Sequence, residues 1–143
     1  MDIAQIIADR DASAIVACDV SMAVRDAVAL LAEKRIGALP VTEGGRVVGI
    51  FSERDVIYRL ADKGGACLNL QVGQIMTAPA ITVEPNTAIN DALGLMTKRR
   101  IRHLPVIENG ALIAFISIGD LVKNRIDEVE HEAEAMRSYI QTA

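Results

Sequence analysis

The sequence predicts an α/β fold in which two pseudo-symmetric repeats, each of the order β-α-β-β-α, pack together and are followed by an extended C-terminal helix. The main observation is that residues 35–41 (RIGALPV) return as residues 100–106 (RIRHLPV), 65 positions later. The same offset places residues 52–55 (SERD) on residues 117–120 (SIGD). Because one such unit buries only a marginal core, we expect both to share one body, and the seam between them is the expected ligand site.

The composition limits the classes of partner that the chain is expected to bind. Of the 143 residues, 51% are hydrophobic, which excludes a disordered chain, and the set is aliphatic, with no Trp, two Phe and two Tyr. A net charge of −4 and the scarcity of aromatic side chains disfavour binding to nucleic acid. The chain shows neither a signal peptide nor an apolar stretch long enough to span a bilayer, so we expect a cytoplasmic protein with no membrane partner.

The two cysteines, Cys18 and Cys67, have no metal-ligand spacing and form no Cys-x-x-Cys motif. They are expected to be buried, reduced thiols, with a disulfide or redox role as the alternative. No group of His, Cys, Asp and Glu has the spacing of a metal site, so neither a metal nor an obligatory cofactor is expected.

Each repeat begins with a short apolar run and a helix. The runs at residues 14–17 (AIVA) and 80–83 (AITV) are short, bounded by polar residues and contain β-branched side chains, which favours strands. The helices are predicted by apolar residues at helical spacing in 24–31 and 88–96, and Ser21 is the expected N-cap of the first.

A β-hairpin and a second helix follow in each repeat. Residues 44–45 (GG) and 109–110 (NG) separate apolar runs, and such pairs favour tight hairpin turns because they accept positive φ. The second helices are expected to begin after Ser52 and Ser117. Residues 61–66 (ADKGGA) predict a flexible connection between the halves.

The predicted organisation has three parts. Residues 1–66 form the first repeat with an N-terminal helix and the connection, residues 67–125 form the second repeat, and residues 118–141 form the C-terminal helix. This helix carries apolar residues spaced by 4, 3, 4, 3 and 4, which is a heptad seam: Val122, Ile126, Val129, Ala133, Met136 and Ile140. We expect the seam to contribute to a homodimer contact, the alternative being that the helix folds back on its own subunit.

Ser-x-x-Asp occurs at the start of both second helices, as Ser52 with Asp55 and as Ser117 with Asp120. A hydroxyl and the free N–H groups of a helix N-terminus suit a phosphate, and a carboxylate three residues on accepts hydrogen bonds from neighbouring hydroxyls such as those of a ribose. The same pattern is close to a capping box, in which the acidic residue bonds back to the N-cap backbone. The motif alone leaves both interpretations open.

The two repeats differ beside their Leu-Pro-Val strands, where Arg102 and His103 in the second repeat replace residues 37–38 (GA) of the first. A guanidinium suits bidentate contact with phosphate, and an imidazole adds a donor whose charge varies near neutral pH, whereas ordinary surface side chains are the alternative. Arg54 is a further phosphate candidate. We therefore expect two unequal sites, with the cleft near Asp120 as the better one.

These segments resemble the CBS domain, named after cystathionine β-synthase, and the pair resembles the tandem arrangement called a Bateman module. The resemblance covers residues 6–125 and rests on residues 35–41 with 49–55 and on residues 99–106 with 116–120. No catalytic, channel or transporter sequence accompanies them, so the chain looks like a stand-alone CBS-pair protein of the bacterial kind.

The resemblance implies ligand sensing. Bateman modules bind adenosine-bearing ligands such as AMP, ADP, ATP, NAD or S-adenosylmethionine in clefts between the repeats. They generally dimerise into a disc, and a partner reads the ligand-dependent change in its shape or stability. In the family the aspartate holds the ribose and the serine or threonine reaches a phosphate, which implies these roles for Asp55, Asp120, Ser52 and Ser117. Residues at the position of Thr82 contact the base or ribose largely through backbone groups.

No residue pattern supports catalysis, because the sequence shows no Ser-His-Asp order, no paired Cys and His and no Gly-rich phosphate loop. The sequence therefore predicts a non-enzymatic, adenine-nucleotide-sensing regulatory homodimer that signals to a partner protein. The expected nucleotide-binding residues are Ser52, Arg54, Asp55, Thr82, Arg102, His103, Ser117 and Asp120. The alternative is a scaffold or interaction homodimer whose ligand clefts are vestigial.

Overall fold

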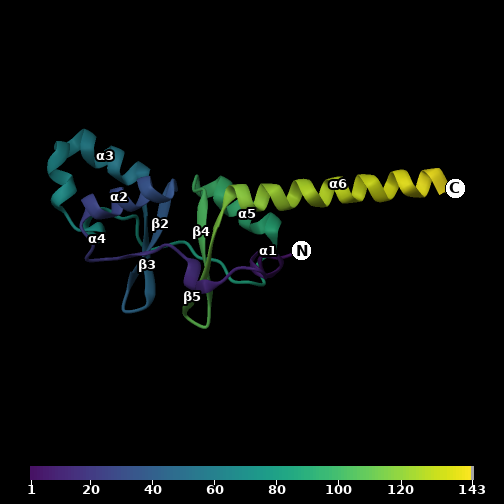
Figure 1. The fold of residues 1–143 in the computed structure, drawn as a ribbon, viewed down its shortest axis with the longest axis horizontal. Helices are drawn as coiled ribbons and strands as arrows, with labels where there is room; N and C mark the ends of the chain where they lie inside the picture. Colours follow the sequence, from purple (N-terminus) through teal and green to yellow (C-terminus); the bar gives the residue numbers. More distant parts are fainter. Residues whose placement is uncertain (143) are drawn as a thin grey trace.

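Two similar units follow one another along the long axis of the molecule, and one long helix projects from the second (Figure 1). The structure is a computed structural model that describes residues 1–142. Its elements, in chain order, are α1 (Ile3–Ile7), the 3-10 turn η1 (Ala12–Ala14), β1 (Cys18–Asp19), α2 (Val24–Lys34), β2 (Ala38–Glu43), β3 (Arg46–Ser52), α3 (Glu53–Lys63), the 3-10 turn η2 (Gly64–Asn69), α4 (Val72–Ile75), α5 (Ile89–Arg99), β4 (His103–Glu108), β5 (Ala111–Ser117) and α6 (Ile118–Thr142). The predicted α/β fold with two repeats and an extended C-terminal helix is confirmed.

Both predicted hairpins are present. β2 pairs antiparallel with β3 and β4 with β5, and the equivalent pairs Pro40–Ile50 and Pro105–Phe115 keep the offset of 65 between the repeats. The turns use positive φ as expected, with φ of 59° and 81° in the Gly-Gly turn and 52° and 81° in the Asn-Gly turn. The second helix of each unit, α3 or α6, follows directly, as predicted.

The entering strands are shorter than predicted and begin later. β1 consists of Cys18–Asp19, which pairs parallel with β2, and in the second unit Val83 forms an isolated parallel bridge to Val106. The preceding residues 14–16 and 80–81 leave the sheet and line cavities between the units. These residues are therefore apolar because they line a cavity, and not because they pair in a β-sheet.

Ser21 does not cap α2, contrary to the prediction. Ala23 is the N-cap residue, and no side chain caps the helix there. Ser21 instead donates from its backbone N–H and its hydroxyl to the Asp19 carboxylate. This local turn is complete before the helix begins, which removes Ser21 from the capping position.

Residues 61–66 do not form the flexible connection that their composition predicts. α3 continues to Lys63, and η2 follows it as a second ordered segment. Cys67 in η2 is fully buried and Cys18 in β1 is almost so, and both thiols are free, as predicted. Burial, with a smaller effect from Asp19, raises the pKa of the Cys18 thiol to about 11, so this thiol stays protonated at neutral pH.

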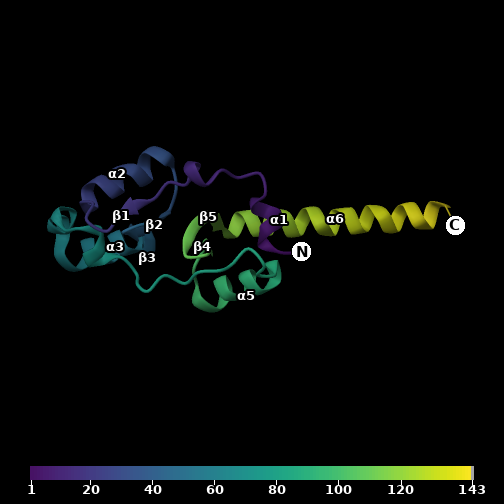
Figure 2. The ribbon, with the colours of Figure 1, turned by 90° about the horizontal axis from the view of Figure 1, so that it is seen from below.

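The two units exchange their short leading helices. α1 precedes the first unit in the chain, but its Ile3 lies in the buried cluster of the second unit. α4 precedes the second unit, but its Val72 and Ile75 lie in the buried cluster of the first. Figure 2 shows α1 beside α6, far from α2.

Backbone hydrogen bonds fix this exchange. The N–H groups of Ile3 and Ala4 donate to the carbonyls of Thr87 and Pro85, at 3.0 and 2.8 Å. The chain-order boundaries predicted above place α1 in the first repeat, a unit against which it does not pack. Residues 8–17 and 76–82 therefore cross from one unit to the other, and they are called the crossing segments below.

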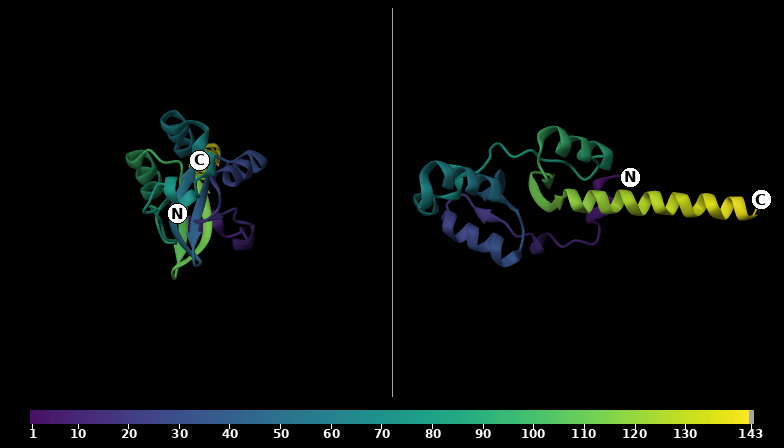
Figure 3. Two further views of the ribbon diagram at one scale, coloured as in Figure 1. Left: turned by 90° about the vertical axis from the view of Figure 1, so that its left-hand side faces the viewer. Right: turned by 90° about the horizontal axis from the view of Figure 1, so that it is seen from above.

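α6 begins at Ile118 and continues for 25 residues, well beyond the second unit. Its Leu121 is buried, whereas every residue from Val129 to Thr142 is exposed. Figure 3 shows the helix extending away from the body without folding back. Among residues 1–142, no helix is both long and apolar enough to cross a bilayer.

His103 lies where the two units meet and stacks on Phe115. The rings are inclined by 12°, with their centroids 5.3 Å apart. Burial lowers the pKa of His103 and the Arg102 charge lowers it further, although Asp120 and Glu53 oppose both effects. The imidazole is therefore neutral at pH 7 in the folded protein.

Gly49→Ala is expected to destabilise the protein. A Cβ at this position in β3 would lie 2.8 Å from the Thr77 backbone oxygen and 2.6 Å from Met76 Sδ. Overpacking of this kind costs about 1–3 kcal/mol, measured as a lower midpoint of urea unfolding. Gly94→Ala is the control, because a Cβ there meets nothing within 4 Å and helix α5 gains up to about 1 kcal/mol. Equal midpoints for the two variants would contradict the close packing of the crossing segment on β3.

The protein is expected to lose stability as the pH falls through 6.5, because the lowered pKa of His103 makes the unfolded imidazole the better proton acceptor. The unfolded state then holds more protons, which is the condition for a free energy of unfolding that decreases with decreasing pH. His103→Gln should flatten this dependence between about pH 7.5 and 5.5. Urea unfolding at several pH values compares the slopes, and identical slopes in the His103→Gln variant and the unmodified protein would refute the role of His103.

Candidate functional site

One cleft between the units contains the first Ser-x-x-Asp motif and is called the Asp55 cleft below. Its volume is about 230 Å³. The first unit contributes the Ser-x-x-Asp turn, the crossing segment contributes Thr77 and residues 79–81, and the second unit contributes residues 99–103.

A second cleft occupies the pseudo-symmetric position and is called the Ser117 cleft below. It has a volume of about 590 Å³, and its walls include residues 14–16, Phe115 and Ser117. At the offset of 65, residues 14–16 correspond to residues 79–81, so the same parts of the repeat build both clefts. Each cleft combines the serine of the Ser-x-x-Asp motif of one unit with residues at the start of the Leu-Pro strand of the other.

The carboxylate of Asp55 is half-buried, and both of its oxygens accept hydrogen bonds from the protein. Oδ2 accepts from the backbone N–H and the hydroxyl of Ser52, at 2.9 and 3.2 Å. Oδ1 accepts from the Thr77 hydroxyl at 3.0 Å. Because each carboxylate oxygen accepts two hydrogen bonds, Oδ1 keeps one acceptor position for a ligand hydroxyl.

Asp120 is held differently from its counterpart. Its Oδ2 accepts from the Ser117 N–H at 2.8 Å, and its Oδ1 forms an ion pair with the Arg10 guanidinium at 3.0 Å. Burial acts to raise the pKa of Asp120, but the hydrogen bonds from Ser117 and Arg10 and the Arg10 charge outweigh it and lower the pKa. The carboxylate is thus ionised and already paired with a cation of the same chain.

The capping interpretation of Ser-x-x-Asp is realised in both units. α3 begins with a complete capping box between Ser52 and Asp55. At α6, the Ser117 hydroxyl accepts from the Asp120 N–H at 3.1 Å while the Asp120 carboxylate accepts from the Ser117 N–H. The cap fixes the Asp55 carboxylate in the wall of its cleft, whereas Asp120 does not line the Ser117 cleft.

Arg102 lies in the Asp55 cleft, which differs from the expectation that it accompanies Asp120. β4 begins beside the Ser-x-x-Asp turn of its own unit, where the Ile118 N–H donates to the Arg102 carbonyl at 2.8 Å, but the Arg102 side chain extends to the first unit. Arg102 Nη2 forms an ion pair with Glu53 Oε1 across the units at 3.3 Å. His103, one residue later, lines both clefts.

The Asp55 cleft is more basic than the sequence motifs indicate. Arg54 lines it, and Arg99 and Arg100 join it from the C-terminal end of α5. Arg54 Nη1 also donates to the Arg100 carbonyl at 3.3 Å, a contact that joins the units and satisfies a carbonyl at the helix end. The run Arg99–Arg100 is evident in the sequence, but only the tertiary packing directs it to this cleft.

Two further polar side chains reach the predicted carboxylates without any signal in the sequence motifs. Thr77 contacts Asp55 and Arg10 contacts Asp120. Both come from crossing segments, whose course depends on the exchange of α1 and α4. Thr82, by contrast, was expected at the site from the sequence, but it is exposed and does not line the Asp55 cleft.

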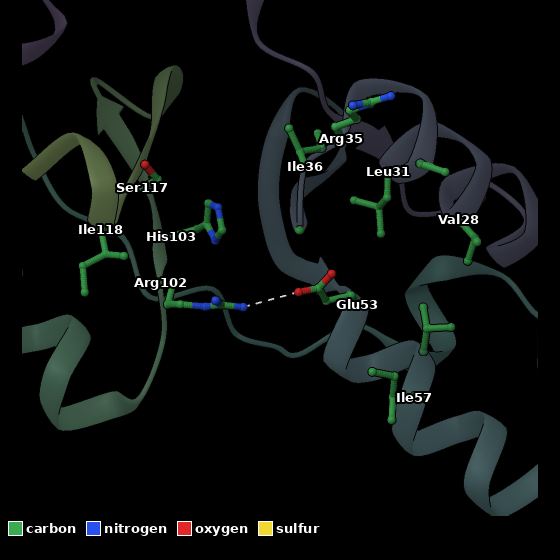
Figure 4. A pocket seen from close by; sticks show the side chains of 13 residues that line it. Val28, Leu31, Arg35, Ile36, Glu53, Ile57, Arg102, His103, Ser117 and Ile118 are labelled. Carbon is green, nitrogen blue, oxygen red and sulfur yellow. Dashed lines mark hydrogen bonds and ion pairs between the residues drawn. The ribbon is translucent and has the colours of Figure 1, made fainter.

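A third, open cavity lies between α2 and α3 of the first unit and the start of α6, and is called the helix groove below (Figure 4). It has a volume of about 650 Å³ and includes apolar side chains such as Leu31 and Ile57. Figure 4 shows the ion pair between Arg102 and Glu53 reaching across this groove. Arg102 and His103 line both the groove and the Asp55 cleft, so the ion pair stands between two cavities.

The Asp55 cleft suits a ligand that joins hydroxyl groups to an anionic group. Asp55, with its anchored carboxylate, shares the cavity lining with four arginine residues, and Ile50 and Ile81 add apolar residues. Guanidinium groups bind phosphate in a bidentate manner, and a carboxylate accepts from vicinal hydroxyls. Among the described residues, no three His, Cys, Asp or Glu side chains come close enough together to hold a metal ion.

The chain matches a known family along most of its length. The family model for the CBS domain matches residues 7–62 and 72–127. The chain is 37% identical over 129 residues to the mitochondrial CBS domain-containing protein CBSX3 of Arabidopsis thaliana. The match covers 87% of this chain and 63% of that protein, so it spans less than two thirds of the relative's length.

Solved structures show the same architecture. A protein with CBS domains from Burkholderia ambifaria has a TM-score of 0.81 and 40% identity, covering 89% of this chain and 95% of that chain. CBSX2, solved in complex with AMP, has a TM-score of 0.74 and 26% identity, covering 88% of this chain and 96% of that chain. With two family matches in register with the two units, the chain belongs to the CBS domain family and carries its two CBS domains in tandem, as a Bateman module does.

Proposed function

We propose that the protein is a non-enzymatic regulatory module that senses an adenine nucleotide and signals to a partner protein through a change in shape or stability. The observation that carries the proposal is the composition of the Asp55 cleft, where an anchored carboxylate shares a cavity with four arginines. CBSX2, whose structure contains AMP, supports the ligand class. The proposed ligands are AMP, ADP, ATP and NAD, each of which joins adenosine to phosphate.

Each part of such a ligand has a matching group in the Asp55 cleft. The Asp55 carboxylate, anchored by Ser52 and Thr77, accepts hydrogen bonds from ribose hydroxyls. The apolar side chain of Ile81 contacts the base. The phosphate oxygens accept from the guanidinium groups that line the cleft, which belong to Arg54, Arg99, Arg100 and Arg102.

The Ser117 cleft is proposed as the weaker site. Asp120 is already paired with Arg10, and the carboxylates of Asp9 and Asp11 line this cleft. A phosphate that entered would meet like charges and compete with an existing ion pair. This order of the two clefts is the reverse of the one expected from the sequence, because Arg102 lies in the other cleft.

The ion pair between Arg102 and Glu53 links ligand binding in the Asp55 cleft to a change at the protein surface. The two side chains are 64% and 58% exposed, so the pair contributes little to stability and exchanges readily. A phosphate in the Asp55 cleft competes with Glu53 for the Arg102 guanidinium. Loss of the pair frees Glu53 in the helix groove and removes one link between the units, which changes the surface that a partner contacts.

We propose that the module acts as a homodimer, and two exposed apolar regions support this assembly. Ile57 and Tyr58 on α3 are 61% and 66% exposed, close to the helix groove. The seam of α6 is exposed as well. Contiguous exposed apolar side chains of this size mark interaction surfaces.

Nucleotide binding is expected to depend on Asp55 and not on Asp120. In differential scanning fluorimetry, a nucleotide that binds the folded state raises the melting temperature, equivalent to about 2.7 kcal/mol at a hundredfold excess over its Kd. Asp55→Asn keeps an acceptor for the Ser52 N–H but loses the charge, so calorimetric titration should show affinity about tenfold weaker. Asp120→Asn is the matched control, with nearly unchanged affinity.

Each other result has a definite meaning. Binding lost in Asp120→Asn and kept in Asp55→Asn would assign the nucleotide to the other cleft. No change in melting temperature with AMP, ADP, ATP or NAD would favour the alternative function, a scaffold or interaction homodimer with vestigial clefts. Turnover of any of these nucleotides would contradict the non-enzymatic assignment.

Glu53→Gln is expected to tighten nucleotide binding, in the opposite sense to Asp55→Asn. The variant releases Arg102 without removing a ligand contact, and an exposed ion pair is worth about 0.2–1 kcal/mol, so the Kd should fall by up to about fivefold. Glu33→Gln on α2 changes the net charge equally but lies outside both clefts, and it serves as the control. Affinity in Glu53→Gln no higher than in Glu33→Gln would rule out the competition.

A further inference from the structure

The apolar seam of α6 is uncovered in the described chain. Val122, Ile126 and Val129 are 42%, 51% and 47% exposed, and Met136 and Ile140 are 62% and 66% exposed. The part of the helix beyond the body carries the most exposed members (Figure 3). From Val122 to Ile140 the row is about 27 Å long, which is an interaction surface and not a scatter of single residues.

The spacing of the seam is that of a two-stranded coiled coil. Steps of 4, 3, 4, 3 and 4 alternate between heptad positions d and a. β-Branched isoleucine fills two of the three a positions, which favours two strands. Position a holds Ile126, Ala133 and Ile140, and position d holds Val122, Val129 and Met136. A second copy of the same helix therefore fits this surface.

The charged residues beside the seam distinguish the two directions of pairing. Arg125 and Glu132 occupy position g, and Glu130 and Arg137 occupy position e. In a parallel pair, each g residue meets the e residue five positions later in the other helix. Arg125 then meets Glu130 and Glu132 meets Arg137. Both contacts occur twice by symmetry, and all four are attractive.

An antiparallel pair has the opposite balance. The register that buries the whole seam sets its first residue against the last residue of the second copy, so that e faces e and g faces g. Glu130 then meets Glu130 of the second copy, and Glu132 meets Glu132. Lys123 meets Arg137. Like charges face each other in all three kinds of contact, which disfavours this direction.

We propose that α6 pairs with α6 of a second copy of this chain in a parallel two-stranded coiled coil, directed by the Arg125–Glu130 and Glu132–Arg137 contacts. The inference rests on the proposed homodimer and adds its direction, with both bodies at the same end of the coil. Arg125 bonds Glu128 of its own helix at 3.2 Å, an exposed pair that exchanges at little cost. A coil of about three heptads adds to the contacts of the bodies and does not form the dimer alone.

Engineered cysteines test the direction. Ile140→Cys brings two equivalent sulfurs together only in the parallel coil, where the Cα atoms approach to the roughly 4.4–6.8 Å that a disulfide needs. In the antiparallel pair the same two positions are about 27 Å apart. We expect mild oxidation to give a covalent dimer on a non-reducing gel. Ser138→Cys, at the outward heptad position f, is the matched control and should stay monomeric on the gel. The unmodified protein should also stay monomeric, because Cys18 and Cys67 are buried.

Charge reversal tests the cause of the direction. Arg137→Glu turns the Glu132–Arg137 contact into a repulsion in the parallel coil, and sedimentation velocity should show self-association about tenfold weaker. In an antiparallel pair the same change would replace the Lys123–Arg137 repulsion with an attraction and tighten association. The double variant Arg137→Glu with Glu132→Arg should regain the affinity of the unmodified protein.

Two results would overturn the proposal. One is a lack of covalent dimer from Ile140→Cys beyond the level of Ser138→Cys, which would leave the helix of a different protein as the occupant of the seam. The other is tighter association of Arg137→Glu. All of these substitutions lie outside both clefts, so nucleotide binding measured on the same samples separates failure of this proposal from failure of the sensor function.

Discussion

The exchange of the short leading helices is the constraint on which both clefts depend. α1 is bonded into the second unit and α4 is packed into the first, so each crossing segment must pass from one unit to the other. These segments supply a wall of each cleft and also the side chains of Thr77 and Arg10, which hold the two aspartates. The two cores and the two clefts thus depend on one packing arrangement. In it, the core of each unit includes the short helix that precedes the other unit in the sequence.

Pseudo-symmetry sets where the clefts lie, and departures from it set their charge. Arg102, just before β4, lines the Asp55 cleft, whereas its counterpart Gly37, just before β2, does not line the Ser117 cleft. The first crossing segment carries Arg10 between two aspartates, whereas Thr77 in the second is uncharged. These departures from symmetry give one cleft lined by four arginines and another lined by Asp9, Arg10 and Asp11, in which Arg10 is already paired with Asp120. The second arrangement contributes to the stability of the fold without needing a ligand.

The parts of the fold that depend on local patterns could be predicted from the sequence. The Gly-Gly and Asn-Gly turns, the two helices that follow them and the long seam of α6 depend on residues close together in the chain. The side of the molecule to which Arg102 points could not be predicted, because the repeat specifies two similar units but not which strand start faces which turn. The contacts of Thr77 and Arg10 with the two aspartates could not be predicted for a related reason, because both residues lie in crossing segments whose sequences show no periodicity. The capping bonds of the Ser-x-x-Asp carboxylates show why the motif alone could not separate a structural role from ligand binding.

The position of α6 also has a mechanical consequence. The helix begins directly after Ser117, its root is fixed by the buried Leu121 and by the Asp120 cap, and the rest of its 25 residues are largely free of the body. A rigid helix of this length is about 37 Å long, so a tilt of only about 5° at the root displaces the tip by about 3 Å. The helix therefore acts as a lever arm, which converts a movement too small to disturb the core into a displacement as large as a side chain.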